Sequence, residues 1–128
     1  MFWNTQNTTR DGIFFIIKYS LDNFSPRLVK QGYSWLRSGE FNEQCDTKDC
    51  IPANYLKHIN RISLPTLLIA GGADKLVNKD NIRERVYEKI TSTDKTYKVF
   101  REYGHIDLLM GKHAEEVFEY VDQWLRRH

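Results

Sequence analysis

The sequence predicts an α/β fold with parallel strands, and three observations carry this prediction. An apolar run at residues 64–70 predicts a buried strand, and residues 96–100 predict a second strand. The stretch between them has Ile82, Val86 and Ile90 at four-residue steps, which is typical of a helix. A strand, a helix and a strand in this order favour two parallel strands joined by a crossover helix.

The composition is that of one folded domain and excludes several classes of protein. Of the 128 residues, 41% are hydrophobic and 13% aromatic, which argues against disorder. The 19 basic and 17 acidic residues are mixed along the chain and give a net charge of +2, so we expect no nucleic-acid partner. No apolar stretch is long enough to cross a bilayer, so we expect no transmembrane segment. The first residues lack the pattern of a signal peptide, which favours a cytoplasmic location.

The first third of the chain predicts helices rather than core strands. Residues 10–23 carry an apolar stripe and predict a helix that covers an apolar surface. A second helix is predicted to begin at Ser25 and Pro26, with the serine as its cap, and to end at Gly39. Residues 40–54 are polar and predict a loop that forms a hinge or the margin of a lid.

Two cysteines, Cys45 and Cys50, lie in this loop. Four residues separate them, and this spacing fits neither a CxxC motif nor a zinc site. A small disulfide loop is one interpretation, but in a chain without an export signal we expect free thiols. The sequence contains no metal-ligand or cofactor motif, so we expect neither a metal nor a cofactor.

Two residues capable of acid–base chemistry follow the two predicted strands. Asp74 comes directly after two glycines and an alanine, and His105 follows the second strand. Because the carboxyl ends of parallel strands meet at one edge of a sheet, we expect the two side chains within hydrogen-bond distance, roughly 2.6 to 3.2 Å. Gly104 is expected to let the chain turn sharply before the histidine. Asp107 is expected to cap a short helix or to hold the histidine loop by accepting backbone amides.

Each of these residues also has a structural interpretation. Asp74 could accept the amides of its own turn, and His105 could be a surface-loop histidine. Their joint placement after two strands, 31 residues apart, favours an acid and a histidine of a catalytic triad. The other histidines, at positions 58, 113 and 128, have no ligand spacing and are expected at the surface.

The last helix is the most clearly predicted element of the chain. Charged residues face one side of residues 114–125, and Arg126 and Arg127 follow at the end that the helix dipole favours for cations. The apolar stripe consists of Ala114, Val117, Phe118, Val121, Trp124 and Leu125.

Residues 22–127 resemble the carboxyl-terminal half of an alpha/beta hydrolase, closest to bacterial esterases and lipases with a helical lid. The resemblance is carried by lid-like stretches at residues 22–28 and 35–39, by the strand and acid at residues 64–74, and by the histidine loop at residues 103–111. The histidine loop is the most specific of these matches.

The resemblance implies a partial alpha/beta-hydrolase fold. Residues 1–54 would form a helical lid-like segment, and residues 55–128 would form the last two parallel strands, their crossover helix and the C-terminal helix. Asp74 would be the triad acid and His105 the general base. The apolar lid suggests a hydrophobic ester or lipid substrate.

The chain departs from this family in lacking its nucleophile. The G-x-S-x-G elbow, the earlier strands and the loop that donates oxyanion amides are absent from the sequence. Ser34 has only the first glycine of the motif and lies inside a predicted helix, so we reject it as a replacement.

Three hypotheses follow from this departure. The first is a truncated serine hydrolase, of the esterase or lipase kind, that is inactive alone. The second is a non-catalytic binding module derived from a hydrolase, and the third is a gene-model or sequencing error upstream. The strand at residues 66–70 would then have an exposed edge. We expect that edge to pair with an upstream half, with a second copy, or with part of residues 1–24.

Overall fold

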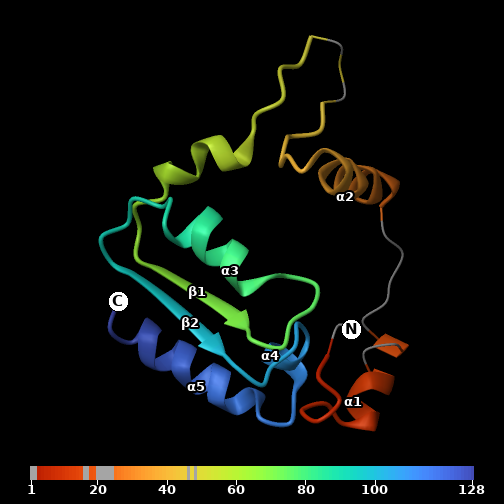
Figure 1. The fold of residues 1–128 in the computed structure, drawn as a ribbon, viewed down its shortest axis with the longest axis vertical. Coiled ribbons are helices and arrows are strands. Elements are labelled where there is room, and N and C mark those ends of the chain that lie inside the picture. The colour runs from red at the N-terminus through yellow and green to blue at the C-terminus, as the bar shows by residue number, and fades with distance from the viewer. Residues whose placement is uncertain (1–2, 16–17, 20–24, 46, 48) are drawn as a thin grey trace.

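The computed structural model describes residues 3–15, 18–19, 25–45, 47 and 49–128 (Figure 1). Two strands and several helices form a mixed structure, and the expected α/β class is confirmed. Among the described residues, no helix is long and apolar enough to cross a membrane. In chain order the elements are α1 (Arg10–Phe15), α2 (Pro26–Ser38), the 3-10 helix η2 (Tyr55–Arg61), β1 (Thr66–Gly71), α3 (Lys79–Ile82), the π-helical turn η3 (Arg83–Tyr87), β2 (Lys95–Phe100), α4 (Asp107–Met110) and α5 (Ala114–Leu125).

Strands β1 and β2 pair in parallel, as the strand–helix–strand order predicts. Thr66 lies opposite Lys95 at the start of the pair, and Gly71 lies opposite Phe100 at its end. Helices α3 and α5 lie on opposite faces of this two-stranded sheet (Figure 1). Both strands therefore end at the same edge of the structure, next to α4.

The core lies between β2 and α5. Phe100, Tyr103 and Val117 are buried there, and three half-buried apolar side chains pack against them, from β1, α4 and α5. The rings of Phe100 and Tyr103 lie 5.3 Å apart between centroids, which anchors the turn after β2 to the sheet. The residues that lead to His105 are thus held by the best-packed part of the protein.

Strand β1 is less buried than its apolar sequence predicts. Only its last two residues, Ala70 and Gly71, are buried, and the others are half-buried. The reason is that β2 is its only strand neighbour among the described residues. Residues 3–15 and 18–19 add no strand to the free edge, so the expectation that part of residues 1–24 covers it is wrong for these residues.

The two N-terminal helices differ in how well the sequence predicts them. α2 has the expected bounds, because Gly39 adopts a left-handed φ of 69° and its N–H donates to the carbonyl of Trp35. Ser25, in contrast, makes no side-chain capping bond, so its predicted capping role is wrong. α1 is described only as far as Phe15, and the rest of the predicted helix falls partly outside the described residues. Its Phe14 and Phe15 are exposed, so they do not cover an apolar surface of the described structure.

The loop after α2 contradicts the expectation of free thiols. Cys45 and Cys50 form a disulfide with their Cα atoms 5.5 Å apart. An antiparallel bridge between Asn42 and Asn54 closes the base of the loop and brings the cysteines within reach of each other. The next element, η2, was not expected as a helix. It begins where the Asn54 side chain accepts the N–H of Lys57.

Helix α5 has the predicted span, but its apolar stripe is only partly buried. Ala114, Val117 and Trp124 are buried, whereas Phe118 and Leu125 are exposed. These two side chains face the region beside the free edge of β1, where the described structure has no covering element. The lack of a second strand neighbour for β1 among the described residues therefore accounts both for the partial burial of β1 and for the exposure of Phe118 and Leu125.

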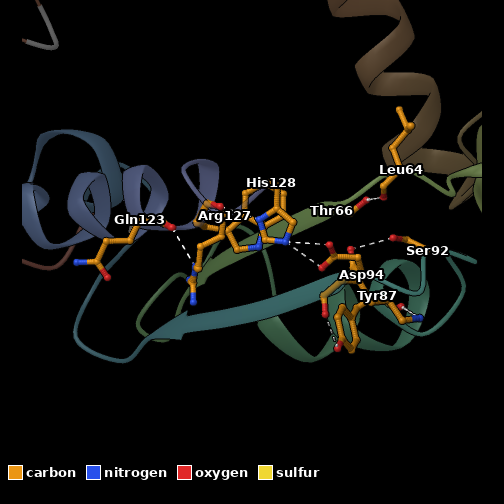
Figure 2. Close-up of polar contacts among 10 residues, drawn as sticks. Leu64, Thr66, Tyr87, Ser92, Asp94, Gln123, Arg127 and His128 are labelled. Atoms are coloured by element: carbon orange, nitrogen blue, oxygen red, sulfur yellow. Dashed lines mark hydrogen bonds and ion pairs between the residues drawn. The ribbon is translucent and has the colours of Figure 1, made fainter.

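His128 links the C-terminal end of α5 to Asp94, the residue before β2. Its ring stacks on Trp124 at a centroid distance of 4.0 Å. Its Nε2 lies 2.9 Å from the carboxylate of Asp94 (Figure 2). The hydrogen bond to the carbonyl oxygen of Trp124 raises the pKa of His128, burial lowers it, and the Asp94 carboxylate raises it again, with a net rise. This histidine has a structural role that its sequence position did not indicate.

Candidate active site

Two glycines let the loop after β1 lie directly against the turn after β2. A Cβ atom on Gly71 would come 2.4 Å from the carbonyl oxygen of Tyr103, and one on Gly72 would come 2.5 Å from that of Arg101. Real Cβ atoms do not approach backbone oxygens so closely. The N–H of Ala73 donates to the same Tyr103 oxygen at 3.0 Å. The glycines therefore hold together the two loops that carry the acid and the histidine.

Asp74 is held by backbone amides and faces the histidine. Its Oδ1 accepts the N–H groups of Leu76 at 2.7 Å and Val77 at 3.0 Å, so the expected turn role is present. Its side chain is only 4% exposed. Burial alone would raise the pKa of Asp74, but the N–H of Val77, the His105 ring and the N–H of Leu76 outweigh it and lower that pKa. Asp74 is therefore an ionised carboxylate near neutral pH.

His105 completes the pair that the sequence predicts. Its Nδ1 lies 2.9 Å from Oδ2 of Asp74, inside the expected range. An ionised carboxylate only accepts hydrogen bonds, so Nδ1 carries the proton and donates it to Asp74. In the neutral ring Nε2 then has a free lone pair, and the side chain is 44% exposed. The ring therefore presents its unprotonated nitrogen on the side away from Asp74.

The histidine loop is held by Asp107, as one of the two sequence interpretations predicts. Asp107 is fully buried at the start of α4, and its Oδ2 accepts the N–H of Gly104 at 2.7 Å. Gly104 was expected to allow a sharp turn, but its φ is not positive, so a glycine is needed here for a different reason. A Cβ there would come 2.8 Å from the backbone nitrogen of Asn4, so the glycine permits a close approach by the N-terminal segment.

An apolar hollow of about 560 Å³ lies beside the acid–histidine pair. Asp74 and His105 line it together with Ile69, Leu108 and Phe118, among other side chains. No serine of the described residues lines this hollow. Ser34 lies in α2 and lines a separate hollow, which agrees with its rejection as the nucleophile.

Two residues near the site were missed by the sequence analysis. Asn4 and Thr8 both bond to Asp107, which lies 103 and 99 residues further along the chain. No local pattern marks such partners, because small polar residues near a chain start are common in loops. Among the described residues, no group of three or more His, Cys, Asp or Glu side chains could hold a metal ion.

The fold and the site together define a class of protein. A strand followed by an acid, a crossover helix, and a parallel strand followed by a histidine are typical of the C-terminal part of an alpha/beta hydrolase. Residues 52–110 match the family model described as serine aminopeptidase, S33, which belongs to the alpha/beta hydrolases. The match includes both Asp74 and His105. No curated protein and no solved structure matches the chain significantly.

Proposed function

We propose that residues 55–128 are the C-terminal part of a serine hydrolase in which Asp74 is the triad acid and His105 the general base. The observation that carries this proposal is the 2.9 Å contact between Nδ1 of His105 and the buried Asp74 carboxylate, at the shared end of two parallel strands. Residues 1–54 would form a lid-like segment. The family match supports the hydrolase class, and the pair supports the acid–base roles.

In the assembled enzyme, a serine outside the described site would attack an acyl carbon. Nε2 of His105 would take the serine proton and later deliver it to the leaving group. Asp74 would keep the ring in the required tautomer and stabilise the imidazolium form. The chain alone would turn over no substrate, because the serine and the oxyanion donors contribute about 10² to 10⁶ in rate.

A hydrophobic carboxylic ester or lipid is the substrate class that we propose. The hollow beside His105 has mainly apolar walls, and α2 exposes an apolar face that includes Leu28, Val29 and Leu36. The name of the matching family also makes an aminoacyl amide worth testing. The disulfide between Cys45 and Cys50 weighs against the cytoplasmic location expected from the sequence, because disulfides are rare in reducing compartments.

We propose that the partner which completes the site pairs with the free edge of β1. An upstream half of the hydrolase would add the neighbouring strand, bury Phe118 and Leu125, and bring the serine to His105. A second copy of the chain could pair with the same edge but would bring no nucleophile elbow.

A non-catalytic module derived from a hydrolase is the second candidate. The observation that favours it is that none of the described serines lines the hollow that holds Asp74 and His105. In that case the apolar surfaces beside β1 would dock a partner, and the acid–histidine pair would be a relic.

A complementation assay separates the two candidates. The chain is incubated with p-nitrophenyl esters, aminoacyl p-nitroanilides or a fluorophosphonate probe, with and without an upstream half of an alpha/beta hydrolase that carries the G-x-S-x-G elbow. We expect no turnover or labelling by the chain alone, and turnover with the added half that His105→Ala abolishes. A complex that forms but never turns over would favour the binding module. Turnover by the chain alone would show that it contains a nucleophile, with Ser34 the first residue to test.

A further inference from the structure

The first described residues are hydrogen-bonded to the loop that carries His105. Asp107, fully buried, accepts the backbone N–H of Asn4 at 2.7 Å through Oδ2, and its Oδ1 accepts the hydroxyl of Thr8. The same Oδ2 also accepts the N–H of Gly104, one residue before the histidine. One carboxylate thus joins residues 4–8 to the histidine loop.

Further bonds join residues 4–8 to the chain on both sides of His105. Before the histidine, the side-chain amide of Asn4 donates to the carbonyl of Glu102 at 2.8 Å. After it, the N–H of Lys112 donates to the carbonyl of Asn7 at 2.7 Å, and the ammonium of Lys112 donates to that of Gln6 at 2.9 Å. We call residues 4–8 the N-terminal strap.

We propose that the N-terminal strap positions the general base, with Asp107 as the positioning residue that connects the strap to His105. This inference rests on the proposed function, because it assigns a role in the same acid–base pair. The imidazole is 44% exposed, and Asp74 is the one polar group among the described residues to which it is hydrogen-bonded. The place of the ring over Asp74 therefore depends on the backbone at Gly104 and Asp107.

The burial of Asp107 supports a positioning role over a general contribution to packing. A buried carboxylate is costly unless donors satisfy it, and here two backbone amides and one hydroxyl do so. Two of these three donors, from Asn4 and Thr8, belong to the strap. Without them the carboxylate would have only the amide of Gly104, and the loop would rearrange to admit water.

The test compares Thr8→Val with Thr8→Ser and with Thr5→Val as the matched control. Thr8→Val removes the hydroxyl donor at nearly constant volume and Thr8→Ser keeps it. Thr5 lies in the same strap but is exposed and is not among the donors to Asp107. The pKa of the Asp74 carboxyl is measured by carbon-13 NMR, because that pKa is lowered in part by His105. This readout responds to the contact between acid and ring, which a loss of stability alone would not change.

We expect Thr8→Val and Asp107→Asn to raise the pKa of Asp74 relative to the wild type. Thr8→Ser and Thr5→Val should leave it unchanged. Folded Thr8→Val and Asp107→Asn proteins with the wild-type pKa of Asp74 would overturn the proposal. An Asp74 pKa that His105→Ala leaves unchanged would instead overturn the acid–histidine pair and with it the proposed function.

Hydrogen exchange of the wild type keeps the proposal testable if Asp107→Asn does not fold. The amides of Asn4, Gly104 and Lys112 should be protected and should open together, because one network holds them. Rapid exchange at Asn4 beside slow exchange at Gly104 would show that the strap is not fastened to the loop, which would overturn the proposal.

Discussion

Replacing Gly71 by alanine should destabilise the protein although alanine is the better residue for a strand. Intrinsic preference alone predicts a gain of roughly 0.5 to 1 kcal/mol, because glycine loses more backbone entropy on folding. In the structure, however, the new Cβ would lie 2.4 Å from the carbonyl oxygen of Tyr103 and 3.0 Å from that of Gly104. Both are backbone atoms, so neither can rotate away. The two loops must separate by about 1 Å to reach ordinary contact near 3.4 Å.

The loss of stability in Gly71→Ala follows from the packing and the hydrogen bond that this separation of the loops disturbs. Overpacking of this kind costs about 1 to 3 kcal/mol. The hydrogen bond from the N–H of Ala73 to the same Tyr103 oxygen would also be lost, at about 0.5 to 1.5 kcal/mol. After the intrinsic gain is subtracted, we expect the free energy of unfolding to fall by about 0.5 to 4 kcal/mol. Urea denaturation, with a slope of about 1 to 3 kcal/mol per molar for small proteins, would register this as a lower midpoint.

Gly32→Ala is the matched control. Gly32 lies inside α2, and a Cβ there would meet no atom within 4 Å. This substitution should increase the helix content measured by circular dichroism and should not lower the unfolding midpoint. The reasoning would be refuted if Gly71→Ala unfolded at the wild-type urea concentration, or if both variants lost stability equally.

Three further outcomes are expected. Because the folded-state pKa of Asp74 lies below its ordinary value of 3.8, its ionised form stabilises the fold above about pH 3.8, and this is lost as the pH falls through the folded-state value. His105→Ala should therefore make acid unfolding begin at higher pH, and an unchanged profile would contradict the pairing. The pKa of His128 is raised above 6.5, so its bonds to Trp124 and Asp94 stabilise the fold below that pH and are lost as the pH rises through the folded value. In thermal unfolding measured at a series of pH values from below 6.5 upward, His128→Ala should remove this loss of stability with rising pH. Finally, the free edge of β1 should cause self-association at micromolar concentration by light scattering, and a monomer with slow exchange along β1 would contradict this.

The elements that the sequence predicts correctly are those specified by local patterns. The apolar run at residues 64–70 leads into β1, and the left-handed Gly39 ends α2. The parallel order of the strands follows from the crossover helix, and the contact between Asp74 and His105 follows from that order.

The features that the sequence did not predict depend on partners far along the chain. Thr8 and Asp107 are 99 residues apart, and nothing in either local sequence indicates the other. The exposure of Phe118 depends on a strand neighbour that the described structure lacks, although its helical stripe predicts burial. The disulfide between Cys45 and Cys50 depends on the bridge at the base of their loop, which the sequence does not indicate.

The tautomer of His105 tests the acid–base pair most directly. In Asp74→Asn, the amide oxygen would keep the N–H groups of Leu76 and Val77, and its NH₂ group would face the ring. The ring must then accept at Nδ1, so the proton moves to Nε2 and the base is lost. Long-range proton–nitrogen-15 NMR of the neutral ring should show Nδ1–H in the wild type and Nε2–H in Asp74→Asn. A wild-type ring protonated at Nε2, with no change in Asp74→Asn, would contradict the assignment of Asp74 and His105 as a triad pair.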